Sequence, residues 1–228
     1  MHRGTLNRVA TAVSAAAVII LMIIGSCKFD IYRIHDSSMS PYLEDGDKIL
    51  AYRLKQGRRK NLTDKVVIFY FPYKDYKPTI SPDTNHLLIK RCIAGPGDSL
   101  RIDNGVVLNR RTGISTYHCR QIPAPLNPSP LFYSVITNNS YSSDDDLLNM
   151  SWIYIPKKGD TLYKRDHHLW HIYNKIIDFE YENDSIPRMD SIHVFTHDYY
   201  FVCGDNMTQS YDSRSWGFLP EEFIISYK

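Results

Sequence analysis

The hydrophobic pattern of the chain begins with one long apolar stretch near its start. Residues 9–27 (VATAVSAAAVIILMIIGSC) carry no charged side chain. At about 1.5 Å per residue, a helix of this length just crosses a hydrocarbon core of about 30 Å. We therefore predict a single transmembrane anchor over 9–27, preceded by a cytoplasmic segment, 1–8.

Two other interpretations of this stretch stay open. A cleaved signal peptide has a similar pattern, although its apolar part is usually shorter. Ile24-Gly25-Ser26-Cys27 is also similar to the lipobox of a bacterial lipoprotein precursor, in which Cys27 would be lipidated. Positive charges flank the stretch on both sides and only slightly favour a cytoplasmic N-terminus. Anchoring and lipidation both place residues 28–228 outside the membrane and tethered to it.

Beyond the anchor, short apolar runs separated by turn residues predict a mainly β, antiparallel fold. Alternating and β-branched or aromatic residues are typical of half-buried strands. Asp103-Asn104-Gly105 separates two alternating segments and is a typical hairpin turn. The predicted strands are KILAYRL (48–54), KVVIFYF (65–71), HLLIKRCIA (86–94), SLRIDNGVVLN (99–109, with the hairpin) and HDYYFVCG (197–204).

The middle of the chain has a different composition and predicts an inserted segment. Four prolines fall within 123–130, and an acidic, serine-rich stretch follows at 142–146. Residues 166–182 form the best helical candidate after the anchor. We therefore predict a catalytic β core made of 28–109 and 192–228, with an inserted variable domain over 110–191.

Composition narrows the possible functions. The formal charge is +2 and the pI is about 8.2, so no basic surplus indicates a nucleic-acid partner. The four cysteines include no C-x-x-C pair and are too few for a disulfide scaffold. His167 and His171 would share a helix face, but spacing indicates no third ligand. We expect no metal and no cofactor.

The first motif with candidate chemistry lies just after the anchor, in IHDSSMSP (34–41). A proline-fixed turn could hold the Ser38 hydroxyl at a rigid position close to the membrane, where it could serve as a nucleophile. Ser37 and Ser40 are neighbouring hydroxyls in the same turn. Taken alone, the motif fits an ordinary polar turn equally well.

The second motif places a lysine inside an apolar strand. Lys90 and Arg91 are adjacent, so in a strand they point to opposite faces and one of them can lie inside. Burial disfavours an ammonium and lowers the pKa of a lysine, which can then accept a proton from serine near neutral pH. The alternative is a lysine that extends its ammonium to water.

The third motif, near the C-terminus, gathers short polar side chains around one arginine and one tryptophan. The segment from Gly204 to Gly217 reads GDNMTQSYDSRSWG. Ser210 could orient a neutral lysine amine, and Asp212 could pair with Arg214 to fix the loop that carries it. A solvent-exposed ion pair of little energetic value is the alternative.

Together the three motifs resemble those of the type I signal peptidases, serine proteases of the serine-lysine dyad class. The matches are Ser-Met-x-Pro at 38–41, Ile-Lys-Arg with Pro-Gly-Asp at 89–98, and the 204–217 segment. The resemblance implies a barrel-like antiparallel β catalytic fold with an inserted second domain. It assigns Ser38 as nucleophile and Lys90 as general base, with Ser210, Asp212, Arg214, Asp205 and Arg91 in orienting or supporting roles and Ile34, Ile89 and Met39 as substrate-binding residues.

The function implied by this resemblance is removal of N-terminal signal peptides from exported precursors. A single-pass enzyme in the bacterial cytoplasmic membrane would cleave on the outer side through an acyl-enzyme on Ser38. Its partners would be precursor proteins and the lipid membrane, with no nucleic acid. A self-cleaving relative of the repressor type is disfavoured by the apolar N-terminus. A catalytically weak or silent envelope protein acting as a binding module stays as the alternative.

One position departs from the family pattern. The family often has a serine two residues before the nucleophile, whose hydroxyl helps to bind the oxyanion, whereas this chain has Asp36. An ionised carboxylate has no proton to donate and would repel the developing negative charge. We expect a slower enzyme, a substitute donor such as Ser37, or a loop that turns Asp36 away.

Overall fold

The computed structural model describes residues 28–55, 61–77, 79–103, 106–110, 113–118, 150–184, 186, 188–206 and 209–228. The predicted anchor, Cys27, and the proline-rich and acidic stretches between 119 and 149 lie outside these residues. Within the described ranges, no helix has the length and apolar character needed to cross a membrane.

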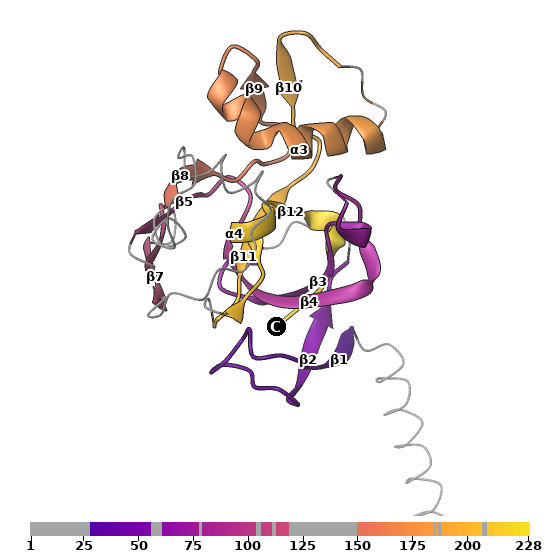
Figure 1. The fold of residues 1–228 in the computed structure, drawn as a ribbon, viewed down its shortest axis with the longest axis vertical. Helices are drawn as coiled ribbons and strands as arrows, with labels where there is room; N and C mark the ends of the chain where they lie inside the picture. Colours follow the sequence, from indigo (N-terminus) through magenta and orange to yellow (C-terminus); the bar gives the residue numbers. More distant parts are fainter. Residues whose placement is uncertain are drawn as a thin grey trace, which may run out of the picture.

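A seven-stranded sheet forms the centre of the molecule (Figure 1). All its neighbouring strands pair antiparallel, and β13, the last strand of the chain, lies between β2 and β3. The strands are, in spatial order, β1 (Phe29–Arg33), β2 (Lys48–Arg53), β13 (Ile224–Tyr227), β3 (Val66–Phe71), β4 (Asp83–Ala94), β11 (Tyr199–Cys203) and β12 (Leu219–Pro220).

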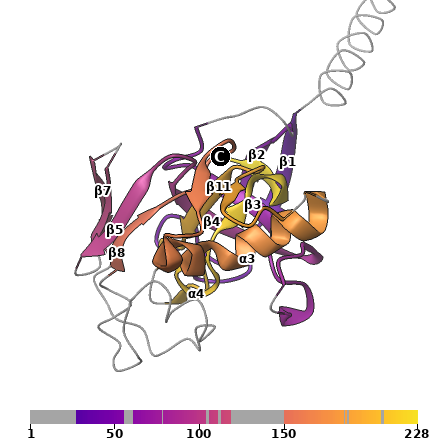
Figure 2. The ribbon, with the colours of Figure 1, turned by 90° about the horizontal axis from the view of Figure 1, so that it is seen from above.

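The other described elements form a second sheet and a helical unit beside this centre. The second sheet is four-stranded, in the order β7 (Gly113–His118), β6 (Val106–Asn109), β5 (Ser99–Asp103) and β8 (Met150–Tyr154). Figure 2 shows it at the left, with the long helix α3 crossing in front of the central strands. The remaining elements are α3 (His167–Asp184), the pair β9 (Thr161–Tyr163) and β10 (Ile192–Val194), α4 (Ser213–Trp216), and the 3₁₀ turns η1 (Lys74–Tyr76) and η4 (Glu221–Phe223).

The prediction of a mainly β, antiparallel fold is confirmed. Each predicted strand overlaps an observed one, and α3 occupies almost the whole predicted helix at 166–182. In the predicted hairpin, Asp103 pairs with Val106, while Asn104 and Gly105 lie outside the described residues. The sequence pattern did not predict β1, β7, β8, β9, β10, β12 or β13, and the domain boundaries at 109/110 and 191/192 stay a prediction.

Buried hydrophobic side chains among the described residues form two clusters. The larger lies around Phe69 and Trp216 of the central sheet region and also includes Tyr173 and Ile176 of α3. The helix α3 is therefore packed into the same core as the strands of the central sheet. The smaller cluster lies under β1 and β2 and consists of Ile34, Met39, Leu43, Ile49, Ala51, Val66 and Ile68.

A buried carboxylate ties α3 to the segment that leads into β11. Glu180 is fully buried and accepts hydrogen bonds from His193 Nε2 (2.8 Å) and Tyr199 Oη (2.8 Å). It also accepts the backbone N–H groups of Thr196 (2.9 Å) and His197 (3.1 Å). Burial alone would raise the pKa of Glu180, but these bonds hold it below its ordinary value. The carboxylate stabilises the fold above the ordinary glutamate pKa, and this contribution is lost as the pH falls through the lowered one.

We predict that Glu180→Ala lowers the free energy of unfolding by about 3 kcal/mol or more, because it leaves several buried donors without an acceptor. Urea unfolding of the detergent-solubilised protein at neutral pH measures this. The exposed Glu182 on the same helix provides the control, and Glu182→Ala should change the value by less than about 0.5 kcal/mol. Equal effects of the two substitutions would contradict the role given to Glu180.

Candidate active site

Ser38 lies in a tight turn that follows β1. The Ile34 N–H donates to the Asp47 carbonyl (2.8 Å) and the Gly46 N–H to the Ile34 carbonyl (3.0 Å), which closes the loop on itself. The Asn206 N–H donates to the Ser38 carbonyl at 2.8 Å. The serine is thus held between its own loop and the third motif, and only 4% of it is exposed.

Lys90 reaches Ser38 from a central strand. It lies on β4 opposite Val67 of β3, and only 2% of it is exposed. Its Nζ donates to Ser38 Oγ at 2.6 Å. Burial lowers the pKa of Lys90, while the negative charges of Asp36 and Asp212 act in the opposite direction and only partly offset it. The result is an amine that loses its proton more readily than an ordinary lysine.

Asp212 and Arg214 form a buried ion pair that fixes the third motif against β11. Arg214 Nε and Nη2 donate to the two carboxylate oxygens of Asp212 at 2.8 Å and 2.9 Å. The Gly204 N–H adds a third bond at 3.1 Å. Burial would raise the pKa of Asp212, but the Arg214 charge and these bonds hold it below its ordinary value. The expected pairing of Asp212 with Arg214 is therefore present and buried.

Gly204 is where the serine turn and Ser210 come closest. A Cβ at this position would lie 2.5 Å from the Ser38 carbonyl oxygen and 2.5 Å from Ser210 Cβ, and closer still to Ser210 Oγ. Only a glycine fits there. Ser210 Oγ is buried and, within the described ranges, has no hydrogen-bond partner of ordinary geometry, although its contact with the Asp212 carboxylate helps to lower the pKa of Asp212. Ser210 thus lies beside Ser38, and its orienting role stays a prediction.

A second ion pair supports the site from the other face of β4. Arg91 Nε and Nη2 donate to the two carboxylate oxygens of Asp205 at 2.9 Å and 2.5 Å. Arg91 Nη1 also donates to the Asp64 carbonyl at 2.9 Å. Because Asp205 precedes Asn206, this pair fixes the backbone that holds the Ser38 carbonyl. As expected from strand parity, Lys90 is inside and Arg91 lies on the opposite face.

The three residues expected to bind substrate belong to, or pack against, the smaller core cluster. Ile34 and Met39 are buried in the smaller core cluster, and the half-buried Ile89 packs against it. They are close neighbours in the fold, although Ile34 and Met39 expose little surface. Their contact with substrate stays a prediction.

Asp36 and Ser37 are both engaged in hydrogen bonds at the mouth of the site. The Ser38 N–H donates to Asp36 Oδ1 at 2.8 Å. Ser37 Oγ donates to Gln209 Oε1 at 2.6 Å, so its proton is directed away from a substitute role in oxyanion binding. Asp36 is not turned away from Ser38. The sequence did not indicate the parts played by Gln209 and the Asn206 backbone.

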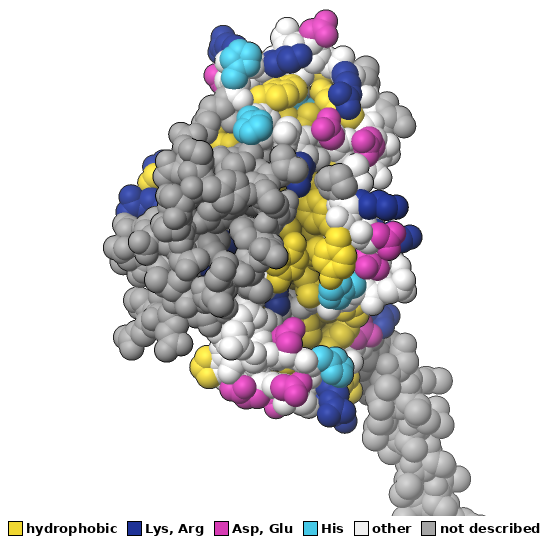
Figure 3. All heavy atoms as spheres, viewed as in Figure 1, with side chains coloured by type: hydrophobic (Ala, Val, Ile, Leu, Met, Phe, Trp, Pro, Cys, Tyr) yellow, Lys and Arg dark blue, Asp and Glu magenta, His cyan; other side chains and the backbone are white. Residues whose placement is uncertain are grey.

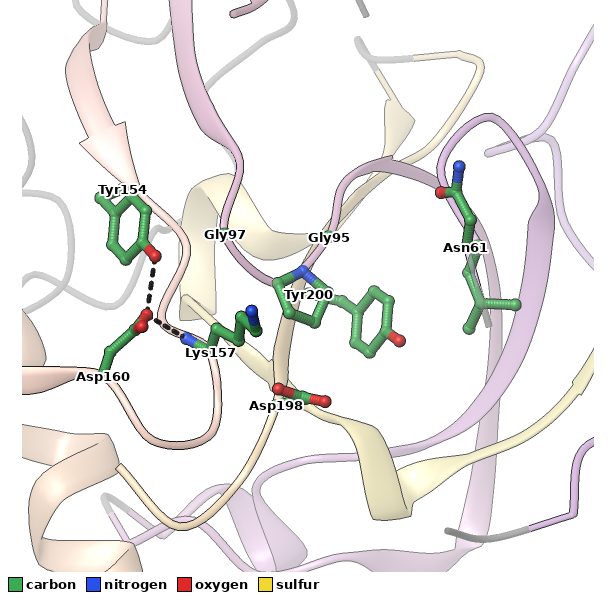
Figure 4. Close-up of a pocket in the computed structure, with 10 residues that line it drawn as sticks. Asn61, Gly95, Gly97, Tyr154, Lys157, Asp160, Asp198 and Tyr200 are labelled. Carbon is green, nitrogen blue, oxygen red and sulfur yellow. Dashed lines mark hydrogen bonds between the residues drawn. The ribbon is translucent and has the colours of Figure 1, made fainter. Parts of the chain in front are cut away.

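Other features of the described residues lie apart from this site. A cavity of about 480 Å³ is lined by residues that include Gly95, Lys157, Asp198 and Tyr200, and neither Ser38 nor Lys90 borders it (Figure 4). His167 and His171 are exposed on α3. Over the described ranges, no group of three or more histidine, cysteine or acidic side chains could hold a metal ion.

A serine hydroxyl against a buried amine is a known variant of the nucleophile and base pair of serine hydrolases. This geometry, on a mainly β fold, is compatible with a serine-type peptidase. A family model described as signal peptidase, peptidase S26, matches residues 6–227, and the chain belongs to this family. It is therefore a serine endopeptidase of the signal peptidase I type.

Two relatives compared by sequence agree with this membership. The chain is 28% identical over 221 residues to a signal peptidase I of Buchnera aphidicola subsp. Schizaphis graminum, covering 90% of this chain and 68% of the relative. It is 26% identical over 208 residues to a signal peptidase I of Aquifex aeolicus, covering 86% and 75%. The crystal structure of a signal peptidase I from Enterococcus faecalis aligns with a TM-score of 0.34 at 14% identity, covering 73% of this chain and 94% of that one.

We predict that Gly204→Ala lowers the rate of precursor cleavage about a hundredfold, because the added methyl group must push the Ser38 turn away from Ser210. It should also lower the free energy of unfolding by about 1–3 kcal/mol through overpacking. Gly95→Ala is a matched control, since a Cβ there would meet Tyr200 at an ordinary 3.4 Å. If both variants cleave at the parent rate, Gly204 has no role in positioning Ser38.

Proposed function

We propose that this protein is a membrane-bound peptidase that removes N-terminal signal peptides from exported precursors through Ser38 and Lys90. The single observation that carries the proposal is the 2.6 Å contact between Lys90 Nζ and Ser38 Oγ, with both side chains buried. Family membership supports the class of substrate. The pairing of this serine with this lysine is our assignment of the chemistry.

The proposed reaction starts from a neutral Lys90. The Ser38 hydroxyl donates its proton to the amine while Oγ attacks the scissile carbonyl carbon. The resulting ammonium returns the proton to the leaving amine as the peptide bond breaks, which leaves an ester on Ser38. Lys90 then takes a proton from water, the hydroxide oxygen attacks the ester, and the proton returns to Ser38 Oγ as the new carboxyl end leaves.

The supporting residues hold Lys90 and Ser38 in their relative positions. Asp212 and Arg214 neutralise each other at 2.8 Å and 2.9 Å and so hold the loop that carries Ser210 beside Ser38. Asp205 and Arg91 hold the backbone that binds the Ser38 carbonyl. We assign them as positioning residues and Ile34, Ile89 and Met39 as the walls of shallow pockets for small substrate side chains. This is consistent with cleavage after an A-x-A pattern.

An apolar face on the first two strands supports a location at the membrane. Phe29 and Ile31 of β1 pair with Tyr52 and Leu50 of β2, and these four residues share one face. Ile31 is 71% and Leu50 55% exposed. In the view of Figure 3, the lower end of the described surface, where β1 and β2 lie, also carries acidic and basic side chains. We propose that this face meets lipid just after the predicted anchor at 9–27.

The rival function is a weakly active or silent binding module on the same scaffold. It is favoured by one observation, the Asp36 carboxylate on the Ser38 N–H. Labelling of Ser38 by a serine-directed lactam would favour an active enzyme, because acylation needs an activated hydroxyl.

We predict that Ser38→Ala and Lys90→Ala each abolish cleavage of a signal-peptide precursor by the full-length protein in detergent, with the melting temperature retained. The acid limb of the parent pH-rate profile should lie well below 10.5, the ordinary lysine value, because burial lowers the pKa of Lys90. Ser40→Ala and Lys175→Ala provide controls from the same turn and from α3. Normal processing by either Ser38→Ala or Lys90→Ala would overturn the assignment.

A second experiment tests the membrane face. We predict that Ile31→Trp, in full-length protein reconstituted with brominated phospholipid, adds fluorescence quenched by the lipid, because its ring would reach the acyl chains. Leu169→Trp is the control, since Leu169 is also exposed (41%) and its helix, α3, lies at the end of the molecule opposite to β1 and β2 (Figure 1). Equal quenching of the two added tryptophans would argue against the face.

A further inference from the structure

The backbone N–H of the nucleophile has a specific use in acyl transfer. As the serine oxygen attacks, the carbonyl oxygen of the substrate gains negative charge, and the N–H of the serine itself is a common donor to it. In this protein that N–H points at a carboxylate. Asp36 Oδ1 accepts the Ser38 N–H at 2.8 Å, which is the distance an oxyanion would take.

We propose that Asp36 is an autoinhibitory cap, whose carboxylate occupies the oxyanion position on Ser38 until a substrate carbonyl displaces it. The inference rests on the proposed function and adds a resting state to it. An oxyanion and a carboxylate oxygen have the same charge and take the same donor, so the two compete for one N–H. Asp36 is exposed, which leaves its side chain room to swing outward.

The hydroxyl next to the cap is directed elsewhere. Ser37 Oγ donates to Gln209 Oε1 at 2.6 Å, so it does not offer its proton to the position that Asp36 fills. A substrate must therefore both open the cap and form its oxyanion on the N–H that the cap releases. Because the substrate must meet both requirements to reach the transition state, the cap lowers kcat and not only the affinity for substrate.

The charge of the cap acts on the base as well. Partial burial raises the pKa of Asp36, but its hydrogen bonds with the side chain and backbone of Ser38 hold that pKa below its ordinary value. The charged groups that face Asp36, Lys90 and His35, lower it further. In return, the Asp36 charge raises the pKa of Lys90 relative to what burial alone would give. Removal of that charge should leave Lys90 neutral at lower pH, so the acid limb of the rate profile should move to lower pH.

An ordinary structural role predicts the opposite outcome. An aspartate that accepts the N–H two residues onward is a common turn former, and a residue needed only for the turn would reduce activity when replaced. The same loop contains another aspartate-to-backbone bond without the chemistry, because Asp47 Oδ2 accepts the N–H of Glu44, three residues earlier, at 2.9 Å. Asp47 is also exposed and provides the matched control.

The test compares Asp36→Ser, Asp36→Asn and Asp47→Ser in the full-length protein, with precursor cleavage measured across pH and melting temperature as a check on folding. Asp36→Ser replaces an acceptor by a hydroxyl donor, so we expect kcat to rise about tenfold or more with little change in KM. Asp36→Asn should give a smaller rise. Both should move the acid limb to lower pH, whereas Asp47→Ser should match the parent.

The outcomes separate the cap from the function on which it depends. Parent activity that is lost in Ser38→Ala establishes the function. With that in place, Asp36 variants that cleave no faster than the parent, or whose acid limb does not move, overturn the cap. Cleavage that persists unchanged in Ser38→Ala refutes the proposed function itself and therefore also refutes the cap, which depends on it.

Discussion

The removal of one amine from water is the constraint on which the rest of this structure depends. Lys90 would be an ordinary cation in solvent, and its pKa is lowered because β4 places it in the interior between β3 and β11. Burial of a polar group is unfavourable unless a partner meets it, and Ser38 Oγ is that partner at 2.6 Å. The fold must therefore bring two segments 52 positions apart into register and hold them there.

Two ion pairs, on opposite sides of β4 and β11, provide that rigidity. Asp212 with Arg214 fixes the loop after β11, and Arg91 with Asp205 fixes the turn that binds the Ser38 carbonyl. Each pair brings opposite charges together, although Asp212 still raises the pKa of Lys90 by more than Arg214 lowers it. Asp36 is different, because the charged group that lowers its pKa most is Lys90. The pKa of Lys90 thus reflects a balance between desolvation and the charges of two carboxylates, Asp36 and Asp212.

Parts of the fold and of the candidate site could be predicted from the sequence, namely those for which a local pattern carries the information. Strand parity indicated that only one of Lys90 and Arg91 could be inside, and the short spacing of Asp212 and Arg214 indicated their pairing. Contacts made by main-chain atoms of distant segments leave no such trace, as with the Asn206 N–H on Ser38 and the tight approach at Gly204. β1 and β13 are short and obtain their stability from neighbouring strands rather than from their own pattern. Asp36 did carry a signal, since an aspartate two residues before another N–H favours a turn bond.

The buried Glu180 has a consequence for anyone who wishes to shorten this protein. A segment that looks dispensable by composition ends in a helix whose carboxylate satisfies donors on the chain leading into β11. Excision of residues 110–191 would leave those donors without their acceptor, in and just before β11, the strand that leads to Gly204. A minimal version of the enzyme would need to keep α3, or supply another acceptor in its place.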